Sequence, residues 1–389
     1  MTEESILRDL EKVTSDSFLH DVARGIRGIN QGFDNGLGRA GEFLYGVQPG
    51  TNTLIGADSG VGKTTFCDEH YVIYPWLSSK LLTSTKKIKY IYFSWEISKP
   101  RKKLRFATRF MASQFGVRLP VAYILGKGKY RCSQEHWELC KVIEPQVEEI
   151  FDDIEMIDEP CNSKTVLRML TKVAETYGTF IKKTTIDKDG EHHQEIIGYI
   201  PHDPDLLIEV IFDHIGLADP DLGSDLKRTM DNISKTGVYF RNRCNWSFAI
   251  IQQFNNNLQS TDRRKLDKSN IIPVRGDFGD STYTFRDADV VWGLVSPAQF
   301  SFNEFQNYDV SKLGPSYIHG FLMKNRDGPP NMSYPLFMDA IAHHFEVLPT
   351  LKFDLNGRIN EFYELATQFR QELDKTDFSD QVPIKQLSQ

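Results

Sequence analysis

Short runs of β-branched and aromatic residues alternate with longer segments of helical periodicity along most of the chain. The runs that predict buried strands are TNTLIG at 51–56, KIKYIYFSW at 87–95, LLIEVIFDH at 206–214, SFAIIQQF at 247–254 and DADVVWGLV at 287–295. Strands that are separated by helices usually pair in parallel, and helices then cover both faces of their sheet. The pattern therefore predicts an α/β protein with a mostly parallel β-sheet flanked by helices.

Further segments extend this core. Residues 3–26 place apolar side chains at helical spacing and predict one or two amphipathic helices. Two alternating stretches around Asp189-Gly190 predict an inserted β-hairpin over residues 177–200. Residues 317–349 predict more strands near a sheet edge. INEFYELATQFRQEL then predicts a helix, followed by a polar tail that we expect to be mobile.

The composition is that of a globular protein, because 40% of the 389 residues are apolar and 25% are charged. No apolar run reaches the roughly 18 residues of a membrane span, and the first residues lack the basic-then-apolar order of a signal peptide. We therefore expect a cytoplasmic protein that binds no membrane. The five scattered cysteines fit neither a disulfide framework nor a zinc motif.

The formal charge of -7 argues against coating of nucleic acid through net charge alone, but a local basic face could still bind it. Two basic runs offer such a face, KPRKKLRFATR at 99–109 and RRKLDK at 263–268. Runs of this kind are also found as ordinary solvated surfaces, so both interpretations stay open.

The stretch GADSGVGKTTF follows the first predicted strand and precedes a helical segment. A phosphate-binding loop needs small residues whose backbone N–H groups point at phosphate oxygens, a lysine for the β- and γ-phosphates and a hydroxyl for magnesium. The strict motif has a glycine at position 57, so this chain matches a relaxed form; the alternative is a chance glycine turn before a helix. We predict binding of ATP with Mg²⁺ by Ala57, Asp58, Ser59, Gly60, Val61, Gly62, Lys63, Thr64 and Thr65.

Two acidic residues end predicted strands. Asp213 closes VIFD, and Glu96 closes YIYFSWE. Hydrolysis of a nucleotide needs one carboxylate that holds the water shell of magnesium and one that orients and deprotonates the attacking water. Each acid alone could be an ordinary strand-end residue. Together with Lys63 they predict an NTP hydrolase.

The ordered series GVGKTT, FSWEIS, VIFDHIGL, IIQQFN, DADVVWGL and KNRDGPP resembles the RecA-type motor domain of the DnaB-like hexameric replicative helicases. The most specific similarities are SWEIS before LRFATRF, and KNRDGP before PLFMD. The resemblance implies a RecA-like P-loop NTPase core over residues 29–350, with an insertion at about 176–204. Residues 1–28 would form a linker helix in place of the family's separate N-terminal helical domain, and 351–389 a terminal helix and mobile tail.

Residue roles follow from this resemblance. It implies that Lys63 and Thr64 bind phosphates and magnesium, that Asp213 supports the metal, and that Glu96 acts as the general base. Gln253 would sense the γ-phosphate and relay its state to loops that contact nucleic acid, although a polar strand end would look the same.

The same resemblance matches Lys324 and Arg326 to a basic pair that enters the active site of the neighbouring subunit. There, positive charge stabilises the transition state of phosphoryl transfer. The sequence fits equally well if both are ordinary charged residues of a solvent-exposed turn.

One loop departs from the family pattern. Where the family has an arginine and a glutamate in a loop that touches single-stranded DNA, this chain has Gly279 and Asp280. Phosphate contacts could come instead from the nearby basic residues Arg263, Arg264, Lys265, Lys268 and Arg275.

The sequence favours an ATP-dependent helicase or translocase that acts on single-stranded DNA in replication. It would work as a homo-hexameric ring with active sites between subunits, with a primase or loader protein as a further partner, in a bacterial or phage-infected bacterial cell. Two alternatives keep the nucleotide site. One is a RecA-like recombination ATPase on single-stranded DNA, and the other is a nucleotide-gated interaction or clamp protein without translocation.

Overall fold

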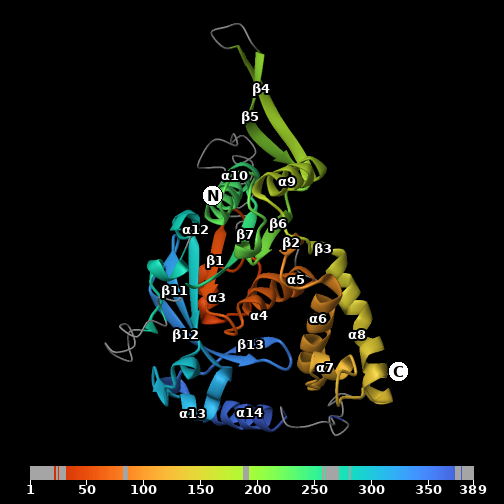
Figure 1. The fold of residues 1–389 in the computed structure, drawn as a ribbon, viewed down its shortest axis with the longest axis vertical. Helices are drawn as coiled ribbons and strands as arrows, with labels where there is room; N and C mark the ends of the chain where they lie inside the picture. Colours follow the sequence, from red (N-terminus) through yellow and green to blue (C-terminus); the bar gives the residue numbers. More distant parts are fainter. Residues whose placement is uncertain are drawn as a thin grey trace, which may run out of the picture.

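A computed structural model of the chain describes residues 22, 25, 32–81, 86–186, 192–255, 258, 271–279, 282–372 and 378. Its main sheet has nine strands in the order β13-β12-β11-β8-β1-β7-β6-β2-β3 (Figure 1). The strands are β1 (Asn52–Ala57), β2 (Lys87–Ser94), β3 (Ile154–Ile157), β6 (Leu206–Asp213), β7 (Ser247–Gln253), β8 (Val290–Val295), β11 (Tyr317–Asn325), β12 (Met332–Asp339) and β13 (His344–Val347).

The direction of pairing changes once across this sheet. From β8 to β3 every neighbouring pair is parallel. The pairs β8-β11, β11-β12 and β12-β13 are antiparallel and form one edge. The predicted α/β class with a mostly parallel sheet is confirmed, as is the group of additional strands near an edge. The short edge strand β3 was not predicted.

Helices cover both faces of the sheet. They are α3 (Arg39–Leu44), α4 (Lys63–Cys67), α5 (Tyr74–Ser79), α6 (Lys99–Phe115), α7 (Val121–Ile124), α8 (Gln134–Asp152), α9 (Ser163–Tyr177), α10 (Leu226–Cys244), α12 (Thr282–Asp287), α13 (Val310–Leu313) and α14 (Ile359–Glu372). A π-helix, η1 (Asp68–Ile73), joins α4 to α5 without a break. Short 3₁₀ turns are η2 (Ile215–Leu217), η4 (Arg275–Phe278), η5 (Pro297–Phe300), η6 (Gly314–Ser316) and η7 (Leu351–Phe353).

Neighbouring residues of the central strand face opposite layers. Ile55 belongs to a core that contains side chains of α4, α6 and α8. Leu54 belongs to a second core that contains side chains of α9, α10 and α14. Successive side chains of a strand point to opposite faces, and both faces are apolar here. This explains why the strand sequences read as continuous apolar runs and not as alternating ones.

The predicted hairpin consists of β4 (Gly178–Ile186) and β5 (His192–Pro201), which pair antiparallel. It projects away from the sheet beyond α9 and α10 (Figure 1). Its base is fixed by the Tyr199 hydroxyl, which donates a 3.0 Å hydrogen bond to the carbonyl of Ala174. A second, short strand pair is β9 (Glu304–Phe305) with β10 (Tyr308–Asp309). The hairpin is confirmed, and its expected Asp189-Gly190 turn lies outside the described residues.

The chain ends differ from expectation at one point. In the segment that we expected to be a mobile tail, Phe378 is fully buried, and its ring centroid lies 5.1 Å from that of Tyr123. At this residue the expectation is wrong, because an aromatic side chain in an otherwise polar segment gains free energy by packing on the body. Of the predicted N-terminal helix, only residues 22 and 25 are described, and both are helical. Within the described part of the chain, every helix is too short or too polar to cross a membrane.

Candidate nucleotide site

The phosphate loop connects the end of β1 to the start of α4. Gly60 and Gly62 have φ angles of 78° and 92°, in the left-handed region that favours glycine. A Cβ atom on Gly62 would lie 2.4 Å from Sδ of Met338, so a larger residue here would also have to displace that side chain. The loop can therefore turn sharply and present its backbone N–H groups, as phosphate binding requires.

Ala57 occupies the place of the motif's first glycine. It is the last residue of β1, is fully buried, and pairs with Gln253 on β7 and with Leu294 on β8. An extended strand residue does not need a positive φ angle, and alanine fits here. The relaxed form of the motif is thus compatible with the loop conformation.

Lys63 is the first residue of α4 and lies folded back over the loop. Its ammonium group donates a 2.8 Å hydrogen bond to the backbone carbonyl of Asp58. Burial lowers the pKa of Lys63, and the negative charges of Glu96, Asp58 and Asp213 oppose this effect. The ammonium group therefore lies where a phosphate group would meet it, close to the acids that hydrolysis requires.

Thr64 and Asp213 form the candidate magnesium pair. The Thr64 hydroxyl donates a 2.9 Å hydrogen bond to Oδ1 of Asp213, which is fully buried at the end of β6. Both are oxygen ligands, the type that Mg²⁺ prefers. Magnesium is usually held by one or two such groups together with substrate phosphates and water. The pair has the oxygen atoms that would suit a nucleotide-bound magnesium ion, and its role stays a prediction.

Glu96 lies in the turn after β2, beside the end of β6. The backbone N–H of Trp95 donates a 2.9 Å hydrogen bond to the carbonyl of Asp213, and the Ser94 hydroxyl closes the turn with a 2.6 Å bond to the carbonyl of Ile97. The Glu96 side chain is exposed, and its charge acts on the pKa of Lys63. A carboxylate in this position can reach water at the phosphate loop.

Gln253 ends β7 in register with Ala57, directly beside the start of the phosphate loop, and its side chain is exposed. The preceding residue, Gln252, differs in its burial and in its contacts. Gln252 is buried, its Oε1 accepts a 2.7 Å hydrogen bond from the Thr284 hydroxyl, and its amide nitrogen donates to the carbonyl of Phe278. Of the two glutamines, only Gln253 presents its side chain to a ligand at this edge.

Lys324 and Arg326 lie at the opposite end of the sheet from the phosphate loop. Lys324 pairs with Val291 near the amino end of β8, whereas the phosphate loop follows the carboxyl end of β1, which runs parallel to β8. Within one chain the two basic residues are therefore remote from the loop. Their predicted role would have to be exercised on another copy.

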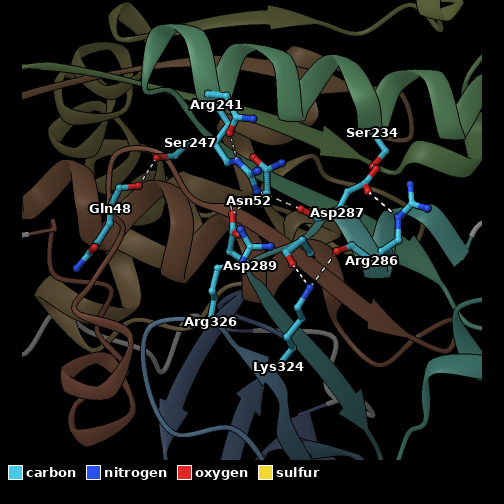
Figure 2. A network of polar contacts seen from close by, with 12 residues as sticks. Gln48, Asn52, Ser234, Arg241, Ser247, Arg286, Asp287, Asp289, Lys324 and Arg326 are labelled. Atoms are coloured by element: carbon cyan, nitrogen blue, oxygen red, sulfur yellow. Dashed lines mark hydrogen bonds and ion pairs between the residues drawn. The ribbon is translucent and has the colours of Figure 1, made fainter. Parts of the chain in front are cut away.

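Figure 2 shows that both basic side chains contact polar groups of their own chain. The Lys324 ammonium group donates hydrogen bonds to the carbonyls of Phe285, Arg286 and Ala288 at the end of α12. Arg326 Nη1 forms a 2.6 Å ion pair with Oδ1 of Asp289, and Arg241 Nη1 donates a 2.7 Å hydrogen bond to Oδ2 of the same carboxylate. Half of the Arg326 side chain remains exposed.

The nucleic-acid candidates can be placed only in part. Arg275 is exposed on η4, a turn tied to the end of β7 by a 2.8 Å hydrogen bond from the Asn255 N–H to the Asp277 carbonyl. It therefore lies near the same sheet edge as the phosphate loop. Gly279 has a φ angle of 63°, which suits glycine and not the arginine of the family pattern. Outside the described residues are Arg263, Arg264, Lys265, Lys268 and Asp280.

Sequence reasoning missed a buried charge cluster. Lys102 and Arg109, both in the basic run at 99–109, are buried and pair with Asp68 and Glu69 on η1. The interpretation of the run as a solvated face is wrong for these two residues. The seven-residue spacing could have indicated a shared helix face, because two helical turns separate the residues.

Comparisons with known proteins agree with this geometry at the level of the fold. No protein-family model matches the sequence, and no curated protein matches it. Among solved structures, the ATPase domain of a helicase superposes with a TM-score of 0.62 at 14% identity, over 86% of this chain and 99% of the other. The chain has the fold of a DnaB-like helicase motor domain.

A second solved structure supports the same fold. It is described as a "DnaB-Like Replicative Helicase" with its primase interactions, and it superposes with a TM-score of 0.62 at 14% identity. The superposition covers 89% of this chain and 71% of the helicase. The predicted RecA-like core is thus confirmed, while the domain boundaries at 28 and 350 remain a prediction.

Proposed function

We propose that the chain is an ATP-dependent DNA helicase or translocase that acts on single-stranded DNA in replication, as a ring of identical subunits. One observation carries the proposal. Lys63, Thr64, Glu96, Asp213 and Gln253 gather at the carboxyl ends of four neighbouring strands of a RecA-like sheet, where open α/β sheets bind their ligands.

The proposed chemistry assigns a task to each group. The loop N–H groups and Lys63 bind the phosphates, and Glu96 accepts the proton of the water that attacks the terminal phosphorus. Magnesium, when bound by the phosphates and Thr64, supplies positive charge that offsets the charge developing in the transition state. Gln253, beside the start of the loop, would respond to the presence of the terminal phosphate.

The position of the predicted basic pair, Lys324 and Arg326, supports the ring. Among the described residues, Lys324 and Arg326 are the basic pair expected at the active site, and they lie at the far end of the sheet from their own phosphate loop. A head-to-tail contact between copies would bring the far end of one chain to the phosphate loop of the next. Such contacts form a ring when the rotation between copies closes, and an open filament when it does not. A primase or loader remains a further proposed partner.

Hydrolysis and assembly should be measured together. We expect ATP hydrolysis that rises severalfold with single-stranded DNA, and a defined oligomer in native mass measurement with a non-hydrolysable nucleotide. Filaments on DNA without unwinding would favour the recombination ATPase. A monomer whose hydrolysis ignores DNA would overturn the motor.

A nucleotide-gated clamp is the second candidate, and the turn at Gly279 favours it. That turn lacks the DNA-contacting arginine of the family pattern, and its positive φ angle suits glycine. A clamp needs nucleotide binding but not repeated hydrolysis. Retention of biological activity by a Glu96→Gln variant would therefore support the clamp over the motor.

A further inference from the structure

Lys102 is a charged residue inside the protein, beside the candidate magnesium pair. It is the fourth residue of α6, and its side chain is 1% exposed. Its ammonium nitrogen lies 3.0 Å from Oδ2 of Asp68, 2.9 Å from the hydroxyl oxygen of Tyr92 and 3.3 Å from Oδ2 of Asp213. An ammonium group has three donors, so every donor has a partner. Such complete pairing is what a buried charge requires.

The two carboxylate oxygens of Asp213 consequently have different partners. Oδ1 accepts the hydrogen bond from the Thr64 hydroxyl at 2.9 Å. Oδ2 lies 3.3 Å from the ammonium group of Lys102 and 3.3 Å from the Tyr92 hydroxyl. Rotation of this fully buried carboxylate would break contacts at both oxygens. The contacts of Oδ2 therefore keep Oδ1 turned toward Thr64.

The same ammonium group joins three elements of the nucleotide site. Asp68 is the first residue of η1, which continues the helix that starts at the phosphate loop. Asp213 ends β6. Lys102 itself belongs to α6, which begins three residues after Glu96. Displacement of any one element would separate a charge from its partner inside the protein, which is costly.

A second buried ion pair joins the same two helical segments without touching this site. Arg109 donates to Oε1 of Glu69 from Nε at 3.0 Å and from Nη2 at 2.6 Å. Arg109 lies two turns beyond Lys102 on α6, and Glu69 follows Asp68 on η1. The described partners of this pair include His344 but neither Thr64 nor Asp213. Removal of this pair therefore shows what the loss of a buried ion pair does when the pair does not contact the nucleotide site.

We propose that Lys102 is a positioning residue of the nucleotide site. Its ammonium group holds Oδ2 of Asp213, so that Oδ1 and the Thr64 hydroxyl stay together as the oxygens that a nucleotide-bound magnesium ion meets. The proposal rests on the proposed nucleotide-binding function. A residue in such a supporting position sets metal affinity through the ligand that it orients.

The test compares two double variants with the parent protein. Lys102→Met alone would leave Asp68 and Asp213 as buried carboxylates without this counter-charge, which is strongly destabilising. Lys102→Met with Asp68→Asn removes one positive and one negative charge, so the local net charge is unchanged. Arg109→Met with Glu69→Gln is the matched control. Circular dichroism establishes that each variant is folded.

Two measurements are made on each protein: titration with a fluorescent ATP analogue at several Mg²⁺ concentrations and in EDTA, and steady-state hydrolysis. We expect the Lys102/Asp68 variant to need at least about tenfold more Mg²⁺ for the same nucleotide affinity, in the usual range for supporting residues. Its affinity in EDTA should stay within about threefold of the parent, and its kcat should fall more than its KM rises. The Arg109/Glu69 variant should match the parent in its Mg²⁺ requirement.

Two outcomes would overturn the proposal. A folded Lys102/Asp68 variant with the Mg²⁺ requirement and kcat of the parent would show that Lys102 is only structural, and would leave the proposed function intact. A parent protein that binds no nucleotide would overturn the proposed function and this inference together.

Discussion

The hydroxyl of Thr64 donates a 2.9 Å hydrogen bond to Oδ1 of Asp213, across 149 positions of the chain. Thr64 is the second residue of α4, the helix after the phosphate loop, and Asp213 ends β6, two strands away from β1 in the sheet. The contact brings two oxygen ligands to one point at the sheet edge. Because Mg²⁺ prefers oxygen ligands, this relationship leads to the first prediction.

Thr64→Val keeps the shape of the side chain and removes its hydroxyl oxygen. We expect nucleotide affinity in EDTA to stay within about threefold, while the gain in affinity on adding Mg²⁺ falls at least about tenfold. Titration of a fluorescent nucleotide with and without Mg²⁺ measures both. Thr108→Val is the control, because within the described part of the chain the hydroxyl of this buried residue donates its hydrogen bond to the carbonyl of Arg105 in its own helix. An unchanged Mg²⁺ response in Thr64→Val would remove this residue from the metal site.

Glu96→Gln removes the proposed general base and keeps its size. Since general-base catalysis contributes about 10²–10⁴-fold, we expect hydrolysis to fall by that factor while nucleotide affinity changes little. A phosphate-release assay gives the rate, and calorimetry gives the affinity. Glu155→Gln, an exposed acid on the neighbouring strand β3, should behave as the parent. If the hydrolysis rate of Glu96→Gln stays within threefold of the parent rate, the general base is another group.

Arg326→Ala and Lys63→Ala should complement each other if Arg326 acts in the site of a neighbouring copy. Each variant alone should lose roughly 10³-fold or more of its hydrolysis, because an arginine that acts in trans contributes at least that much. In a ring assembled from equal amounts of both, about a quarter of the interfaces combine an intact loop with an intact arginine.

The expected result of mixing is therefore recovery of about a quarter of parental hydrolysis, measured after co-assembly with nucleotide. The controls are the two variants at the same total concentration, unmixed. Hydrolysis of the mixture no higher than the mean of the two controls would mean that Arg326 serves its own chain or none.

The ion pair between the buried Glu69 and the partly buried His344 predicts a pH dependence of stability. Burial alone would lower the pKa of His344, but the charge of Glu69 and hydrogen bonds with Glu346 and Glu69 outweigh it and raise the pKa to about 9. A histidine whose pKa is raised on folding stabilises the fold fully below its unfolded pKa of about 6.5. This stability is lost as the pH rises through about 9, and it amounts to about 3 kcal/mol.

Urea denaturation between pH 6.5 and 9.5 measures this effect. The parent should lose more unfolding free energy over this interval than His344→Asn does, by about 3 kcal/mol. His343→Asn is the matched control. Burial lowers the pKa of His343 to about 4, so it is neutral throughout the interval, and asparagine accepts its φ angle of 54°. Equal slopes for the parent and His344→Asn would contradict the assigned charge state.

Most of the sheet and the phosphate loop could be predicted because their signals are local. The placement of Asp213 and Glu96 at one edge of the sheet could also be predicted, because Asp213 ends one apolar strand and Glu96 follows another within two residues. The carboxyl ends of parallel strands meet at one edge of the sheet. The four-residue strand β3 was missed, since only Ile154 of its IEMI sequence is buried and its run is short. The buried Phe378 was missed because a single aromatic residue carries no periodic signal.

The sequence by itself determined the α/β order of elements, the glycine turn before Lys63 and the strand ends that carry the acids. These features depend on the backbone preferences of single residues and on the regular spacing of apolar residues along an element. Both can be recognised from residues that are close in the sequence. Tertiary structure alone decided that Lys102 pairs with Asp213 inside the protein, and that Arg326 lies far from its own loop beside Asp289. Which partner a buried charged side chain has depends on how far it is removed from water and on its distance from other charges. Both are fixed only when segments distant in the sequence pack together.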